Sequence, residues 1–285
     1  MKTADKRIEN HDDIYAMKNV FAYCRRIIIF FFCSYIGSLP PLFLELIFLD
    51  KTECTWKSTA LVPYDFAQQP IVYYSVLVVQ AIGNCLNCII ACTSDTFGFL
   101  LISLLCGHIE VLSLHLKKIG NFERRSANDS NRLRLLEQLN HHGLLTDYAT
   151  ELNNHLSAIF FVQVSISAPI ICTCAYQFSQ AQNFTTTQLI FLASYTIGML
   201  LQIITPSYAS TNLMDKCDLL PVAIFSSEWY ELGPSEKKSL LIFLTRSIRP
   251  FVMNAGNFFK MDINTFIKIV KTAYSLLAVL QSTQP

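Results

Sequence analysis

Long stretches without any charged residue constrain this chain more than any other feature. No Asp, Glu, Lys or Arg occurs from Ile27 to Leu44 (18 residues), from Phe66 to Ser94 (29 residues) or from Leu152 to Met214 (63 residues). A helix that crosses a bilayer needs about 20 mostly apolar residues. The three stretches therefore predict one, one and two transmembrane helices, and the apolar C-terminal stretch predicts a fifth.

We therefore expect an all-α membrane protein, a helical transmembrane bundle with five spans in the chain. The distribution of charges predicts six segments along the sequence. They are a cytosolic segment (1–26), two transmembrane helices with an extracellular loop at 50–70 and a cytosolic helix extension (27–116), a cytosolic loop and helix (117–151), two more transmembrane helices (152–214), a cytosolic anchor segment (215–261) and a final transmembrane helix with its tail (262–285).

The basic residues predict an orientation for these spans. Of 22 Lys and Arg residues, only Lys51 and Lys57 fall in the connection between the first and second charge-free stretches. Basic residues are enriched in cytosolic loops of membrane proteins. This pattern places the N-terminus in the cytosol and the C-terminus outside. The net charge of +1 and the lack of a basic patch with interleaved aromatic residues argue against nucleic-acid binding.

Residues that bind metals or catalyse reactions elsewhere have no favourable arrangement here. Cys85 and Cys88 form a C-x-x-C pair inside a predicted span, without a second pair of ligands. His141 and His142 are adjacent, so they cannot point the same way on a helix, and we expect them on a cytosolic helix surface. We predict no cofactor, no metal and no enzymatic activity. Cys54 could form a disulfide with Cys172 or Cys174, or remain free.

The C-terminal third carries a series of short motifs. Trp229-Tyr230 is followed by a segment, 235–247, with leucines at helical spacing, which predicts an amphipathic helix between Gly233-Pro234 and Pro250. A turn at Gly256 precedes the last helix, and Asp262 suits the positive end of that helix. The order of these motifs resembles the C-terminal region of insect odorant receptors. The motifs are Pro206-Ser207-Tyr208-Ala209, Ser227-Glu228-Trp229-Tyr230, Arg249-Pro250, Asn254-Ala255-Gly256-Asn257-Phe258-Phe259 and Lys271-Thr272-Ala273-Tyr274-Ser275.

The resemblance implies a subunit of an odorant-gated cation channel in the plasma membrane of a sensory neuron. Its partners would be an odorant receptor co-receptor, in a hetero-oligomer, and a small volatile ligand. That family has seven spans, so we expect its first two to be absent from this chain. A gustatory receptor of the same superfamily, and a small five-span transporter or membrane assembly factor, are the alternatives. An extracellular C-terminus disfavours a G-protein-coupled receptor.

Four groups of candidate site residues follow from helical spacing, from the predicted topology and from the resemblance. The candidate odorant-pocket residues combine aromatic and small side chains, and each of them singly could equally be a helix-packing residue. They are Tyr35, Ser38, Leu42, Tyr73, Tyr74, Leu77, Phe191 and Tyr195. The resemblance places the pore at the end of the last helix, where Ala278, Gln281 and Ser282 share one face. Trp229 and Tyr230 are a candidate subunit contact, or alternatively pack locally against the segment 235–247, and Asn183 is a candidate glycosylation site.

Overall fold

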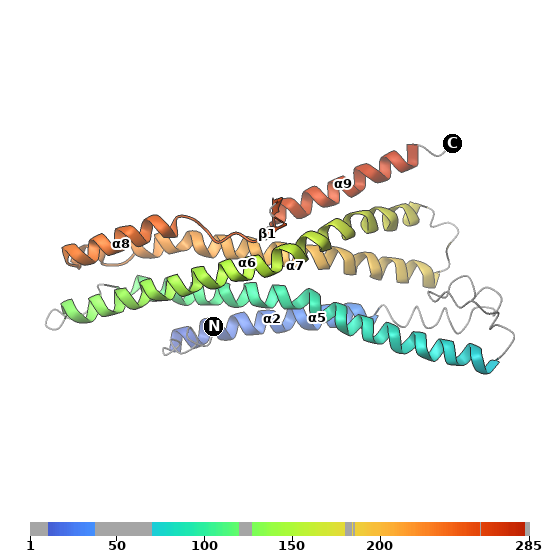
Figure 1. Ribbon diagram of the computed structural model, residues 1–285, viewed down its shortest axis with the longest axis horizontal. Helices are drawn as coiled ribbons and strands as arrows, with labels where there is room; N and C mark the ends of the chain where they lie inside the picture. Colours follow the sequence, from blue (N-terminus) through green and yellow to red (C-terminus); the bar gives the residue numbers. More distant parts are fainter. Residues whose placement is uncertain are drawn as a thin grey trace. The chain divides into compact units, whose positions relative to one another are not determined.

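The computed structural model describes residues 11–37, 70–119, 127–179, 184, 186–256 and 258–282, and these residues are almost entirely helical (Figure 1). The elements in chain order are α2 (His11–Gly37), α5 (Pro70–Lys117), α6 (Ala127–Ser179), α7 (Thr186–Phe225), the short 3-10 helix η3 (Trp229–Glu231), α8 (Pro234–Ser247), strands β1 (Asn254–Ala255) and β2 (Phe259–Lys260), and α9 (Ile263–Ser282).

Four of the described helices are long and apolar enough to cross a membrane. Their qualifying segments are Asp12–Gly37, Val78–Lys117, Arg132–Ser179 and Gln188–Phe225. The prediction of an all-α membrane bundle is confirmed at this level. The last helix, α9, has 20 residues, which is about 30 Å of helix and matches the hydrocarbon thickness of a bilayer. Its membrane crossing remains a prediction.

The helices continue through the expected boundaries between membrane and cytosolic segments. α5 has 48 residues, α6 has 53 and α7 has 40, each about twice the number needed to cross a bilayer or more. α2, the first described helix, already includes His11, well before the expected span at Ile27. The second half of that expected span lies outside the described residues.

The chain divides into two compact units, and each is described by itself. The first unit contains residues 1–26, 98–166 and 203–269, and the second contains residues 27–97, 167–202 and 270–285. The C-terminal half of α5 forms the centre of the first unit. Its fully buried side chains recur every three or four residues, which is the spacing of one helix face. They are Phe99, Ile102, Leu105, Ile109, Leu112 and Leu116.

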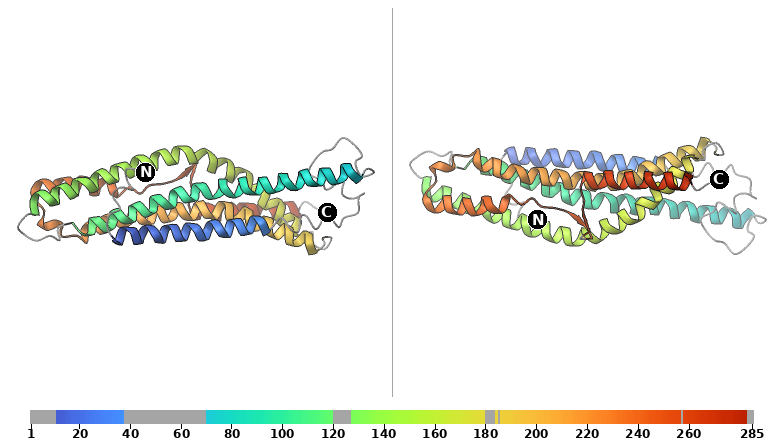
Figure 2. Two further views of the ribbon diagram at one scale, coloured as in Figure 1. Left: turned by 90° about the horizontal axis from the view of Figure 1, so that it is seen from below. Right: turned by 90° about the horizontal axis from the view of Figure 1, so that it is seen from above.

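The N-terminal part of α2 lies along this half of α5 in the first unit (Figure 2). A Cβ atom at Gly107 would come 2.9 Å from the Met17 sulfur, so the two helices approach closely there. Tyr23 packs against Phe99, with ring centroids 5.9 Å apart. At the end of the contact, His115 Nε2 lies 2.8 Å from the Oδ2 atom of the buried Asp13. This packing stabilises the part of α2 that precedes the first apolar stretch.

The helix α8 confirms the amphipathic segment expected from the sequence. Gly233 is its N-cap, Pro234 occupies the first helical position, and the helix ends at Ser247. Proline suits that position because its missing N–H would have no partner inside the helix. Figures 1 and 2 show α8 beside the first half of α6, and the buried Phe243 ring lies edge-on to His142, with centroids 4.8 Å apart.

The expectation that His141 and His142 lie on a helix surface is wrong, because both are buried in the first unit. His142 also stacks on Phe251, with ring centroids 5.8 Å apart. Burial, and secondarily the nearby positive charge of Arg246, lowers the pKa of His142 from 6.5 to about 4. The surrounding part of α6 carries several charged residues before the charge-free stretch at Leu152, so His142 lies outside that stretch.

A two-stranded hairpin connects α8 to α9. Asn254 pairs with Lys260 and Ala255 with Phe259. Gly256 has a φ of +60°, and a Cβ atom there would come 2.7 Å from Cγ of Phe161 on α6. The turn expected at this glycine is confirmed. Both the left-handed backbone and the close approach of the ring require glycine.

We predict that Gly256→Ala destabilises the protein. The left-handed backbone alone costs about 1–2 kcal/mol for a residue with a Cβ atom, and the contact with Phe161 adds to this cost. The matched control is Gly143→Ala on α6, where a Cβ atom meets nothing within 4 Å. The control should be neutral or stabilise by about 0.5–1 kcal/mol. Thermal unfolding of the detergent-solubilised protein measures both, and equal Tm values for the two variants would contradict the prediction.

The environment of His142 predicts a loss of stability in acid. Because its pKa is lowered in the folded chain, the unfolded chain binds a proton first as the pH falls from 6.5 toward 4. Stability is therefore full above 6.5 and falls below it, by roughly 2 kcal/mol at pH 5. Replacing the imidazole by a ring that cannot titrate, in His142→Phe, should flatten this part of the Tm against pH curve. Parallel curves for the two proteins would show that His142 does not cause the acid sensitivity.

Candidate functional site

The Tyr35 side chain, a candidate pocket residue, contacts an acidic residue within the second unit. Its hydroxyl donates a hydrogen bond to the Asp95 carboxylate, and the Gln202 side chain hydrogen-bonds the same group. Tyr35, Asp95 and Gln202 are all half-buried. The three residues come from α2, α5 and α7. A carboxylate among apolar helices is costly unless it has polar partners, so this cluster holds the three helices in one register.

Apolar packing supports the Tyr35 ring from its own helix. Phe31 lies one turn earlier on α2 and is 1% exposed, and its ring centroid is 6.4 Å from that of Tyr35. The Tyr35 ring is thus held at its base by Phe31 and at its hydroxyl by Asp95. An aromatic side chain held at both ends presents a rigid surface.

Phe191 and Tyr195 lie one turn apart on α7 and stack on each other. Their ring centroids are 6.2 Å apart with an interplanar angle of 19°. Phe191 is half-buried and Tyr195 is 38% exposed. The sequence prediction that these two rings share one helix face is confirmed, whereas their role in binding stays a prediction.

The other candidate pocket and glycosylation residues have no described side chains. Ser38, Leu42 and Asn183 lie outside the described residues. The backbones of Tyr73, Tyr74 and Leu77 belong to α5, but their side chains lie outside the described part as well. Cys54, with its possible disulfide, is also outside.

The candidate pore residues are at the end of α9. Ala278 and Gln281 are exposed within the described chain, and the side chain of Ser282 lies outside the description. Ala273, one turn before Leu277, is buried, so α9 packs one face and leaves another open. This amphipathic arrangement is compatible with a helix that has protein on one side.

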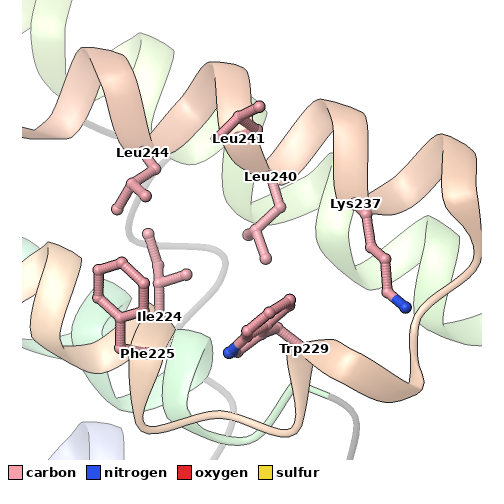
Figure 3. A pocket seen from close by; sticks show the side chains of 7 residues that line it. All are labelled: Ile224, Phe225, Trp229, Lys237, Leu240, Leu241 and Leu244. Carbon is pink, nitrogen blue, oxygen red and sulfur yellow. The ribbon is translucent and has the colours of Figure 1, made fainter.

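A groove lies next to the candidate subunit contact, Trp229 and Tyr230. Its volume is about 280 Å³, and Figure 3 shows Leu240 and Leu244 of α8 pointing toward Trp229 and the end of α7. Trp229 is 39% exposed and Tyr230 is 58% exposed. We call this the α8 groove. It is lined by Ile224, Phe225, Trp229, Lys237, Leu240, Leu241 and Leu244.

Trp229 therefore packs partly against α8, as one of the two interpretations of the sequence requires. Part of its ring nevertheless stays uncovered, and both Phe225 and Leu241 on the groove walls are 63% exposed. Exposed aromatic and aliphatic side chains that gather in one place mark interaction surfaces more often than scattered ones do. The local packing of Trp229 and a subunit contact are compatible with each other.

Comparison with known proteins decides the family. Residues 1–274 match the family model described as the 7tm odorant receptors. The chain belongs to the insect odorant receptor family. Membership agrees with the resemblance seen in the sequence and leaves the five-span transporter without support. Members of the family are ion channels and multi-pass membrane proteins, so the prediction that this odorant receptor is not an enzyme is confirmed.

Individual relatives are similar over most of this odorant receptor. Odorant receptor 33c of Drosophila melanogaster is 26% identical over 272 residues, which is 93% of this chain and 69% of the relative. Odorant receptor 85a of the same species is 22% identical over 98% of this chain and 68% of its own length. Odorant receptor 10 of Aedes albopictus is 24% identical over 76% of this chain and 56% of its own length. The chain thus spans between about half and about two thirds of these relatives.

A solved structure has the same fold. The olfactory receptor OR5 of Machilis hrabei, in complex with eugenol, superimposes with a TM-score of 0.80 over 95% of this chain and 69% of that protein. A second structure of the same receptor gives a TM-score of 0.73. The identities of 16% and 14% show that the fold is retained while most side chains differ.

Sequence reasoning did not select the cluster of Tyr35, Asp95 and Gln202 in this odorant receptor. The signal available was the position of Asp95, the first charged residue after the stretch 66–94. An ionisable residue at the edge of an apolar helix needs a partner. Nothing in the sequence indicates which residue that partner is, because Tyr35 is 60 positions away.

Proposed function

We propose that this chain binds volatile odorants and gates a cation channel together with an odorant receptor co-receptor. The observation that carries the proposal is the family match over residues 1–274. The fold is shared with a receptor whose structure holds eugenol, a small volatile molecule, which supports a ligand of that size class here. The channel would be located in the plasma membrane of sensory neurons.

The candidate pocket lies in the second unit. Tyr35, with its hydroxyl held by Asp95, and the stacked pair of Phe191 and Tyr195 supply rigid aromatic surface from α2 and α7. Small-molecule sites are mostly apolar with a few fixed polar groups, and a volatile ligand needs this combination. Ser38, Leu42, Tyr73, Tyr74 and Leu77 are the other proposed pocket residues.

The proposal is tested by expressing the chain with an insect odorant receptor co-receptor and recording currents evoked by a panel of volatiles that includes eugenol. We expect a cation current for some members of the panel that cells with the co-receptor alone do not give. Tyr195→Ala should reorder the responses because it removes a ring from the proposed pocket surface, and Tyr35→Phe should do so because it frees the Tyr35 ring from Asp95. Ile197→Ala, an exposed change on α7, is the control. Silence with the chain at the cell surface would contradict the proposal.

The α8 groove is the proposed contact with a neighbouring subunit. Its lining is apolar apart from Lys237 and includes Trp229, whose ring contacts that of the exposed Tyr230. Protein interfaces are enriched in such aromatic residues. A helix or loop of the co-receptor that buried these side chains would remove them from water.

We predict that Trp229→Ala lowers co-purification of the chain with the co-receptor. Truncation of a large aromatic at an interface typically costs about 2 kcal/mol or more of binding free energy. Leu133→Ala, at an exposed position of α6 away from the groove, is the control and should leave co-purification unchanged. Intact complexes together with a lowered Tm of the isolated chain would show that Trp229 serves local packing only.

The last helix is proposed to line the ion path, with the C-terminus outside. Support comes from the exposure of Ala278 and Gln281 on α9 and from the concentration of basic residues in zones that share one side of the membrane. Small and polar side chains on one helix face suit a water-filled pore. The asparagine of the sequon at Asn183 would then also be outside.

The orientation and the pore face are tested together with thiol reagents that do not cross membranes. Ala278→Cys and Ser282→Cys should react from the outside, faster in the presence of odour, and reaction should reduce the current. Leu276→Cys, which points in another direction on α9, and the untreated parent chain are the controls. Protection of both cysteines in closed and open channels, or labelling only from the cytosolic side, contradicts the assignment.

A further inference from the structure

Backbone N–H groups at the base of α9 donate hydrogen bonds to side chains of two other helices, α6 and α7. The Asn254 N–H donates to Oδ1 of Asn153 at 2.7 Å. The Gly256 N–H lies 2.9 Å from Oγ and 3.0 Å from the carbonyl oxygen of Ser157. These bonds join the hairpin before α9 to α6.

A third bond reaches the first turn of α9 itself. The first N–H groups of a helix have no partner within it. In α9 the Asp262 carboxylate caps one of them, the Thr265 N–H, at 2.7 Å. The Ile263 N–H instead donates to Oγ1 of Thr211 on α7 at 3.2 Å, and the Thr211 hydroxyl donates in turn to the Ser207 carbonyl at 3.0 Å.

Apolar side chains pack around these hydrogen bonds. The Phe161 ring of α6 stacks on Phe258, with centroids 5.2 Å apart, and also contacts Phe259. Ala255 and Met261, on either side of the turn, are fully buried, and the Met261 N–H donates to the Met253 carbonyl at 2.8 Å. All of these residues belong to the first unit, so the arrangement is described within one compact body.

We infer that Asn153, Ser157 and Thr211 are positioning residues for gating: they hold the base of α9 against α6 and α7, so that odorant binding moves the pore end of this helix. We call these three residues and their three N–H donors the α9 clamp. The inference rests on the proposed channel function. α9 is one continuous helix from Ile263 to Ser282, and the Thr211 bond holds its first residue.

The position of the clamp explains why polar side chains occur at these places. Asn153 and Ser157 are one turn apart on α6 and therefore face the same way. The segment they bind contains Gly256, whose positive φ and contact with Phe161 bring the backbone close enough for both bonds. Backbone N–H groups buried without an acceptor are costly, so removing an acceptor should loosen the base of α9.

The electrophysiological test removes one acceptor at a time. Asn153→Ala and Thr211→Val should each raise the odour EC50 about 3- to 10-fold and lower the maximal current, as expected for one lost hydrogen bond. Cation selectivity and the rank order of odours should not change. Thr211→Ser keeps the hydroxyl and should restore the parent EC50. Thr150→Val is the matched control, because that exposed hydroxyl bonds only the carbonyl one turn back on its own helix.

Hydrogen exchange tests the clamp independently of channel activity. In the parent chain the amides of Asn254, Gly256 and Ile263 should exchange slowly. Thr211→Val should speed exchange at Ile263, and Asn153→Ala at Asn254, while Thr150→Val changes neither. Unchanged exchange in both variants overturns the clamp even if the channel is silent. Altered exchange with an unchanged or lowered EC50, at equal surface amounts, overturns its role in gating.

Discussion

The whole arrangement depends on the need of the backbone to satisfy its own hydrogen bonds where no water is available. In the hydrocarbon core a chain can do this only as a helix or a closed barrel, so the charge-free stretches of this sequence become helices. The helices then continue far beyond a bilayer. At 1.5 Å per residue, the 53 residues of α6 measure about 80 Å against a hydrocarbon thickness of about 30 Å. Parts of α5, α6 and α7 build the first unit, and the buried residues of α5 recur there every three or four positions.

The sequence predicts those parts of the fold that depend on local pattern. Four features could be predicted because each is specified by residues within one or two turns. They are the apolar stretches, the amphipathic segment at α8, the turn at Gly256 and the start of the last helix after Asp262. The part of α2 before the first apolar stretch could not be predicted. Its buried side chains, Met17 and Cys24 among them, are interspersed with charged residues, and only contact with α5 distinguishes the buried face.

Contacts between distant residues account for the other differences. His141 and His142 look like surface residues because imidazoles usually are, yet Phe243 and Phe251 come from far along the chain to cover His142. The hydrogen bond of Tyr35 with Asp95 likewise joins positions that no periodicity relates. For the candidate site, the sequence predicts which aromatic residues share a helix face, but it does not predict which polar residues they bond to.

Apolar packing and hydrogen bonds between helices stabilise this chain in different ways. Apolar packing is non-directional, so it holds helices together while tolerating small rotations and slides. A hydrogen bond between helices is directional and contributes only about 1 kcal/mol, which selects one register without making it permanent. In this chain such bonds join α2, α5 and α7 at Asp95, and α6, α7 and the base of α9 at Asn153 and Thr211. A channel subunit needs this balance, since its helices must keep one arrangement at rest and leave it for the modest free energy that a small ligand supplies.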